Sequence, residues 1–165
     1  MRSISVSSTV RMVDIGEKPV VRRSARVEGF LRLKPETLKA VKEGKVKKGD
    51  VFATAELAAI TAVKRTPELV LLAHPIPITD VQVDLFLDEA RSGVKAAVEV
   101  KSIARTGVEL EALLGVMACL LNVFDMCKYL EKDARGQYPT TFFTEIRVVE
   151  KSKEPIEENE SRERE

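Results

Sequence analysis

Hydrophobic and polar residues alternate along four segments of the chain, and a period of two is typical of strands with one buried face. The segments are residues 20–33, 81–87, 94–100 and 142–150. A short stretch ending in Ser92-Gly93 separates the second segment from the third, which predicts a hairpin. Together the four segments predict a sheet.

Two helices are expected between the first strand and the hairpin. Pro35 and Gly44 frame a short helix over residues 36–43. A second helix is expected over residues 51–65, with Asp50 as its N-cap.

A third helix is expected before the last strand. It opens with the capping-box pattern Thr106-Gly107-Val108-Glu109 and runs to about Lys132. Its uncharged stretch, residues 112–124, is shorter than the roughly 20 apolar residues of a membrane span. Because the helix is apolar nearly all round, it needs the sheet on one side and another element or a second subunit on the other.

The order of these elements predicts an α+β fold, a ferredoxin-like β-α-β-β-α-β sandwich with a mainly antiparallel sheet and helices on one face. We expect a flexible N-terminal arm over residues 1–13 and a single domain over residues 14–151. Residues 152–165 hold six acidic and three basic residues and one apolar side chain, which predicts a disordered acidic tail.

Composition narrows the class of protein. The 165 residues suffice for one domain, and a net charge of +1 with 5% aromatic residues gives no reason to expect nucleic acid or a membrane as a partner. Without the tail the net charge becomes +4, so the domain is more basic than the whole chain.

The cysteines and the N-terminus bear on the cellular compartment. Cys119 and Cys127 lie about 12 Å apart along one helix, too far for a disulfide, and no signal-peptide pattern opens the chain. We therefore expect a cytoplasmic protein.

Charged residues in unusual places are the remaining candidates for chemistry, because the sequence has no phosphate-binding glycine loop, nucleophile elbow or metal-ligand cluster. Asp125 and Lys128 are neighbours on one helix face, either as a helix-end ion pair or as an acid/base lysine tuned by a carboxylate. Glu109 and Glu111 either complement the helix dipole or serve a site. Glu111 and Asp125 lie about 21 Å apart along the helix, so a shared site would require an antiparallel helix from a second subunit.

Three further features each allow two interpretations. The lysines at 45, 47 and 48 precede a helix N-terminus and could hold phosphate or remain solvated, and Asp50 would compete for the same amides. His74 is either a hydrogen-bonded structural residue or a ligand contact. The arginines at 22, 23 and 26 suit an anion or the solvent equally well.

Taken together, several blocks resemble the cyclic pyranopterin monophosphate synthases, the molybdenum cofactor biosynthesis protein C family. The blocks, which keep the family's order and approximate spacing, are Met12-Val13-Asp14-Ile15, Lys48-Gly49-Asp50-Val51-Phe52-Ala53-Thr54-Ala55, Ala62-Val63-Lys64-Arg65-Thr66-Pro67-Glu68-Leu69, His74-Pro75, Arg105-Thr106-Gly107-Val108-Glu109-Leu110-Glu111-Ala112-Leu113 and Asp125-Met126-Cys127-Lys128.

The resemblance implies a lyase that converts (8S)-3′,8-cyclo-7,8-dihydroguanosine 5′-triphosphate into cyclic pyranopterin monophosphate and pyrophosphate. It also implies a homohexamer, a trimer of dimers with each active site at a dimer interface. It calls for no redox cofactor and no protein-held metal, although Mg²⁺ can accompany the triphosphate.

The resemblance also assigns roles to particular residues. Lys48 and Lys128 would be the acid/base lysines, and Asp125 the catalytic carboxylate that orients and tunes its neighbour. The residues that would hold the guanine-derived rings are Leu72, Ala73, His74, Glu109, Leu110 and Glu111. The cations that would meet the triphosphate are Arg23, Arg26, Lys64 and Lys151.

The chain departs from the family pattern at four places. Ala73 stands where the family commonly has Cys, and Leu110 where it commonly has Met. Residues 134–141 lengthen the last connection, and an acidic tail follows Lys151 in place of a glycine-rich basic run. Two rival functions fit the same fold: a non-catalytic module that binds a small anion or a protein, and an RNA-binding domain, which would need more exposed strand aromatics than Phe86.

Overall fold

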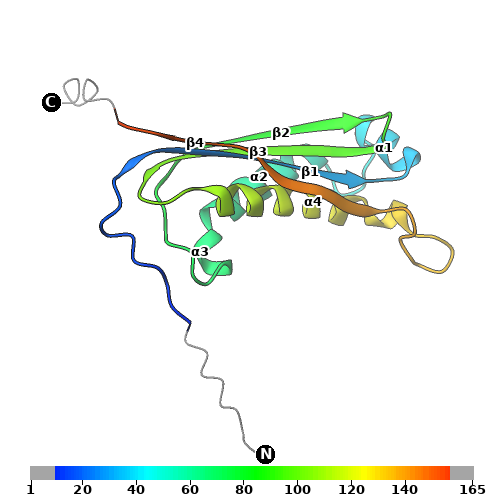
Figure 1. Cartoon of the computed structure of the whole chain (residues 1–165). Helices are drawn as coiled ribbons and strands as arrows, with labels where there is room; N and C mark the ends of the chain where they lie inside the picture. Colours follow the sequence, from blue (N-terminus) through cyan, green and yellow to red (C-terminus); the bar gives the residue numbers. More distant parts are fainter. Residues whose placement is uncertain (1–9, 157–165) are drawn as a thin grey trace, which may run out of the picture.

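The structure is a computed structural model that describes residues 10–156 of the chain. Its elements, in chain order, are β1 (Val21–Arg32), α1 (Pro35–Lys42), α2 (Val51–Lys64), α3 (Thr66–Leu69), β2 (Ile78–Asp88), β3 (Gly93–Ala104), α4 (Glu109–Glu131) and β4 (Phe142–Glu154). The strands form one sheet in the order β2-β3-β1-β4, and all neighbours are antiparallel. α2 and α4 lie on one face of this sheet (Figure 1), which confirms the predicted α+β fold.

Small residues bring α2, α4 and the sheet close together. A Cβ on Gly115 of α4 would lie 2.9 Å from Val63 of α2 and 3.1 Å from Val98 of β3, so only glycine permits this approach. On α2, Ala55 and Ala59 are fully buried against the same core. The core therefore lies between the sheet and the two long helices, and it fixes the position of α4.

α4 is long and apolar enough to cross a membrane by length and composition, but half of its most apolar stretch is buried inside the fold. It contacts α2, β1 and β3, as a core helix does. Cys119 and Cys127 are both buried on α4 and both free, as their spacing predicts. Burial raises the pKa of the Cys119 thiol to about 12 and that of Cys127 to about 11.

The predicted capping box at the start of α4 is wrong. The helix begins at Glu109, and its N-cap is Val108, which makes no side-chain capping hydrogen bond. Thr106 lies two residues before that N-cap and so is too early to cap the helix. The Glu109 carboxylate instead accepts a hydrogen bond from Lys151 of β4.

β4 corrects the expected start of the tail. The strand continues to Glu154, and residues 152–154 pair with β1, where the hydroxyls of Ser24 and Ser152 lie 2.8 Å apart. Of the expected tail, residues 157–165 lie outside the described residues. Of the expected N-terminal arm, residues 10–13 form neither helix nor strand, and residues 1–9 lie outside the described range.

Two local features were not expected from the sequence. Pro67 lies in the first turn of the four-residue helix α3, which follows directly after α2. Phe30 alternates with buried residues of β1 and so belongs to the outer face of the sheet, yet it is only 2% exposed. The guanidinium of Arg91 covers the Phe30 ring at 4.0 Å and is itself held by two hydrogen bonds to Glu145.

Candidate active site

Asp125, near the C-terminal end of α4, holds two lysine side chains at once. Lys128 Nζ lies 2.7 Å from Oδ1, and Lys48 Nζ lies 2.6 Å from Oδ2 and 3.1 Å from the Asp125 carbonyl oxygen. Lys128 is three residues further along the same helix, whereas Lys48 comes from the connection between α1 and α2. The three predicted catalytic residues therefore meet within one chain, and each is about half exposed.

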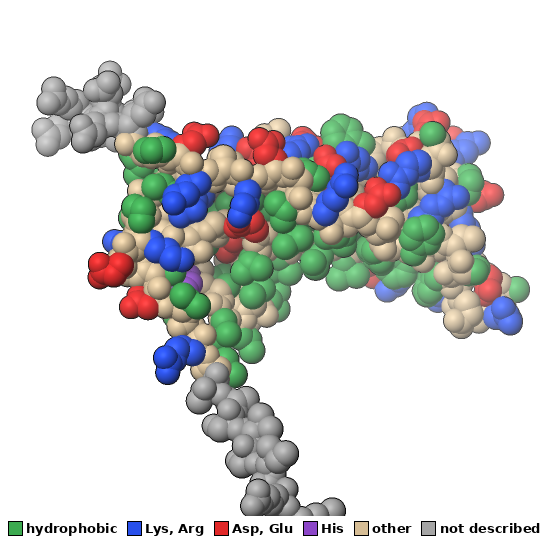
Figure 2. All heavy atoms as spheres, viewed as in Figure 1, with side chains coloured by type: hydrophobic (Ala, Val, Ile, Leu, Met, Phe, Trp, Pro, Cys, Tyr) green, Lys and Arg blue, Asp and Glu red, His purple; other side chains and the backbone are tan. Residues whose placement is uncertain are grey.

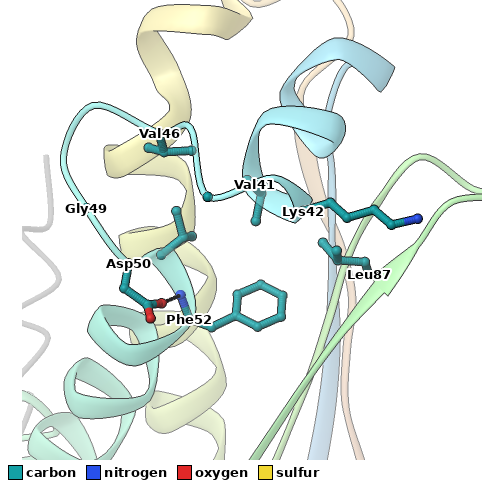
Figure 3. A pocket seen from close by; sticks show the side chains of 9 residues that line it. Val41, Lys42, Val46, Gly49, Asp50, Phe52 and Leu87 are labelled. Carbon is teal, nitrogen blue, oxygen red and sulfur yellow. Dashed lines mark hydrogen bonds between the residues drawn. The ribbon is translucent and has the colours of Figure 1, made fainter.

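The loop before α2 carries both the cap of that helix and Lys48. Asp50 caps α2: its Oδ1 accepts a hydrogen bond from the N–H of Phe52 (Figure 3) and another from the N–H of Ala53, both at 3.0 Å. These amides are therefore already occupied, as the competition at Asp50 allowed, and they are not free for a phosphate. Lys45 pairs with Glu43 at 2.6 Å, and Lys48 is the lysine of this loop that binds Asp125.

The two lysines change the acidity of the cluster. Hydrogen bonds from Lys128 and then from Lys48 lower the pKa of Asp125 to about 2. In return, the hydrogen bond to Asp125 raises the pKa of Lys128 above its usual value. At neutral pH the carboxylate is thus ionised and Lys128 is protonated.

A second group of predicted residues surrounds a cavity of about 330 Å³ at the other end of α4. Its lining includes the predicted ring-binding residues Leu72, Ala73, His74, Leu110 and Glu111. The first three lie on the loop between α3 and β2, and the other two lie in the first turn of α4. The cavity combines apolar walls with polar groups, as sites for small molecules do.

Glu111 and Glu109 differ although only one residue separates them. Glu111 is 2% exposed, its Oε2 has no hydrogen-bond partner, and burial raises the pKa of its carboxyl group. Burial also opposes the ionisation of Glu109, but its own backbone N–H, Lys151 at 3.0 Å and the charge of Arg23 outweigh it and lower the pKa. Glu109, Lys151 and Arg23 thus form a charged group beside the cavity.

The N-terminal segment supplies a wall of the same cavity that the sequence did not predict. Arg11, Val13 and Lys18 line it, although residues up to 13 were expected to form a flexible arm. The guanidinium of Arg105 binds the carbonyl oxygens of Gly16 and Lys18 and so fixes this segment. In the sequence, only the family resemblance of residues 12–15 and of the block that begins at Arg105 pointed to this region.

Two predicted phosphate ligands lie apart from this cavity. Arg26 is on the outer face of the sheet, where its Nη2 lies 3.0 Å from Asp84 and its Nη1 3.9 Å from Glu99. Lys64, the last residue of α2, lines a neighbouring cavity of about 420 Å³. That cavity shares Ile76 with the first one, so Lys64 is adjacent to the site, whereas the sheet separates Arg26 from it.

A further cavity lacks this chemistry. A cavity of about 610 Å³ lies between α1, the start of α2 and the end of β2, with mainly apolar lining that includes Val41, Phe52 and Leu87 (Figure 3). It contains none of the predicted site residues. Within residues 10–156, no cluster of three or more His, Cys, Asp or Glu side chains could hold a metal ion.

The site has two halves, one at each end of α4: a carboxylate with two ammonium groups, and a cavity with a buried carboxyl group and nearby cations. Paired proton donors and acceptors, together with a small-molecule cavity on the same α+β scaffold, are the features expected of an enzyme. A model of the MoaC family matches residues 12–154, and the chain belongs to this family, that of the cyclic pyranopterin monophosphate synthases.

Named relatives are similar over most of their length. "Probable cyclic pyranopterin monophosphate synthase" of Pyrococcus abyssi (strain GE5 / Orsay) is 51% identical over 144 residues, which cover 87% of this chain and 89% of that protein. The protein of the same name from Pyrococcus horikoshii is 53% identical with the same coverage. "Probable cyclic pyranopterin monophosphate synthase accessory protein" of Methanothermobacter thermautotrophicus is 51% identical, also over 87% of this chain and 89% of its own.

Proposed function

We propose that this protein is a cytoplasmic cyclic pyranopterin monophosphate synthase of molybdenum cofactor biosynthesis. It would convert the 3′,8-cyclo-7,8-dihydroguanosine 5′-triphosphate intermediate into cyclic pyranopterin monophosphate and release pyrophosphate. The observation that carries the proposal is the position of Asp125 between Lys48 and Lys128, in a chain that matches the MoaC family over residues 12–154.

The cluster at Asp125 suits the proton transfers of this reaction. Rearrangement of the purine-derived ring requires protons to be moved, and attack of a sugar hydroxyl on the α-phosphorus requires a base. Lys128 is protonated in the free chain, because Asp125 raises its pKa. Asp125, ionised across the neutral range, would orient the two ammonium groups and stabilise whichever lysine is protonated.

The cavity at the other end of α4 would hold the ring system. His74 and the backbone of Leu72 and Ala73 form one wall, and Leu110 with Glu111 forms another. The unpartnered Oε2 of Glu111 would accept a hydrogen bond from a ring N–H or amino group, which would satisfy a buried polar atom that lacks a partner in the free chain.

Cations beside the cavity would meet the triphosphate. Lys151 and Arg23 lie next to Glu109, and Lys64 lies at the adjoining cavity. Cations there would stabilise the charge on the departing pyrophosphate. Arg26 remains a prediction, because in one chain it is engaged by Asp84 on the outer face. We propose no resident cofactor, and any Mg²⁺ would enter with the triphosphate.

Two chains would complete one site. Exposed apolar side chains on α4, at Leu110, Met117 and Leu121, form a face that neither the sheet nor α2 covers. An antiparallel copy of α4 packed on this face would bring the Asp125 cluster of one chain to the cavity of the other. We propose such dimers as the units of a homohexamer.

The proposal is tested by supplying the cyclic triphosphate intermediate and measuring pyrophosphate and pterin product. We expect turnover by the wild type and loss of about 100-fold or more in Lys48→Ala and in Lys128→Ala. Lys45→Ala is the matched control, because Lys45 lies in the same loop but pairs with Glu43. Binding of the intermediate without turnover by the wild type would instead favour the non-catalytic anion-binding module.

A further inference from the structure

Tyr129 contacts the loop that carries Lys48. It follows Asp125 by four residues on α4, and its hydroxyl accepts a hydrogen bond from the backbone N–H of Lys47 at 3.1 Å. The Lys47 ammonium lies 5.4 Å from the centre of the same ring. The end of α4 therefore contacts this loop at two points. Asp125 binds the side chain of Lys48, and Tyr129 binds the backbone of Lys47.

The ion pair with Asp125 is by itself a weak restraint on Lys48. Both side chains are about half exposed, and exposed ion pairs gain little because water screens them and a lysine loses rotamer freedom. A second contact that fixes the adjacent backbone removes part of this entropic cost before the ammonium reaches the carboxylate.

The conformation of the loop makes Lys47 the natural point of attachment. Val46 is buried in the core, and the N–H of Gly49 donates to its carbonyl oxygen at 3.1 Å, which closes a turn with Lys47 and Lys48 at its corners. The turn is closed by the N–H of Gly49, and the N–H of Lys47, at the corner of the turn, donates to Tyr129. Anchoring Lys47 thus orients the whole turn against α4.

We propose that Tyr129 is a positioning residue: it anchors the turn over residues 46–49 to α4 and so holds the Lys48 ammonium at Asp125. The anchoring stands on the contacts within this chain. Only its consequence for catalysis rests on the proposed function, through the role given there to Lys48.

Three variants separate the contributions of Tyr129. Tyr129→Phe keeps the ring but removes the acceptor for the Lys47 N–H, and Tyr129→Leu removes both ring and hydroxyl. Lys47→Ala is the matched control, because it removes the ammonium above the ring and keeps the backbone N–H that Tyr129 binds.

The first readout is independent of activity. We expect Tyr129→Phe to speed hydrogen exchange of the amide at position 47 about tenfold and to weaken the NMR signal of the hydrogen-bonded Lys48 ammonium. Lys47→Ala should leave both unchanged. A Lys48 signal that stays unaltered in Tyr129→Phe would overturn the proposal, and this variant decides the matter even if Tyr129→Leu does not fold.

The second readout is kinetic. We expect Tyr129→Phe to lower kcat up to about tenfold with KM within about twofold, because Tyr129 binds the loop of Lys48 and is not among the residues that line the substrate cavity. A released Lys48 ammonium with unchanged kcat would support the anchoring and overturn the catalytic role of Lys48. An unaltered ammonium with lowered kcat would overturn the anchoring and leave the proposed function in place.

Discussion

Glu111 and Asp125 lie on the same side of α4, fourteen positions and about 21 Å apart along its axis. Glu111 is buried at one end beside the cavity, and Asp125 holds two lysines at the other. A small nucleotide derivative cannot contact both within one chain. The straight helix that organises the core therefore also separates the two halves of the site.

The separation predicts complementation between two inactive variants. A chain with Asp125→Ala and a chain with Glu111→Ala should each lack activity. Mixed after dissociation at equal concentrations, they should recover about a quarter of the wild-type activity, because half of the dimers are mixed and one of their two sites is intact. The measurement is turnover of the cyclic triphosphate before and after mixing.

Remixing two batches of the Asp125→Ala variant alone provides the control for the dissociation step. A wild-type chain that sediments as a monomer at the assay concentration would contradict the shared site. So would an active mixture in which cross-linking detects no mixed dimers.

Asp125→Asn should separate catalysis from folding. The amide keeps the shape of the side chain but loses the charge that binds Lys48 and Lys128. We expect activity to fall about 100-fold or more, with Tm within about 2 °C of the wild type, because the cluster is half exposed. A large drop in Tm, measured by calorimetry, would assign the cluster a structural role instead.

Glu111→Gln should stabilise the free protein at neutral pH. Burial raises the pKa of Glu111 in the folded protein. The stability that this group contributes is therefore fully present below the usual carboxyl pKa. It is lost as the pH rises through the raised pKa. The variant should match the wild type near pH 4 and exceed its Tm by about 2–4 °C at pH 7.

Glu109→Gln provides a comparison of opposite sign. The pKa of Glu109 is lowered, so its contribution is present above the usual carboxyl pKa and is lost as pH falls. This variant should be less stable than the wild type at pH 7. Equal Tm profiles for the two variants would contradict the electrostatic assignment of both glutamates.

Gly93→Ala should destabilise the hairpin between β2 and β3. A Cβ at this position would collide with the carbonyl oxygen of Leu31 and with the ring of Phe30, and the backbone oxygen cannot move without breaking strand pairing. We expect a loss of about 1–3 kcal/mol in the free energy of unfolding, measured by denaturant titration. Gly136→Ala, in a loop where a Cβ meets nothing within 4 Å but φ is +76°, should cost less.

Local patterns were sufficient where the physical cause is local. Alternation along β1 and β3 follows from one buried face, and Asp50 caps α2 because its side chain reaches amides two and three residues later. The prediction of a capping box at Thr106 was wrong, because a matching sequence pattern does not fix the residue at which a helix begins. The burial of Phe30 could not be predicted, because Arg91, which covers its ring, lies in the connection between β2 and β3.

The sequence by itself determined the four strands, the long core helix, the pairing of Asp125 with Lys128 and the resemblance to a family of known activity. Only the tertiary structure decided that Lys48 joins Asp125, that the Tyr129 hydroxyl binds the backbone of the same loop, that the N-terminal segment lines the cavity and that Arg26 lies on the outer face. Spacing along one helix fixes contacts between near neighbours, whereas contacts between Lys48 and Asp125 depend on how α2 and α4 pack on the sheet.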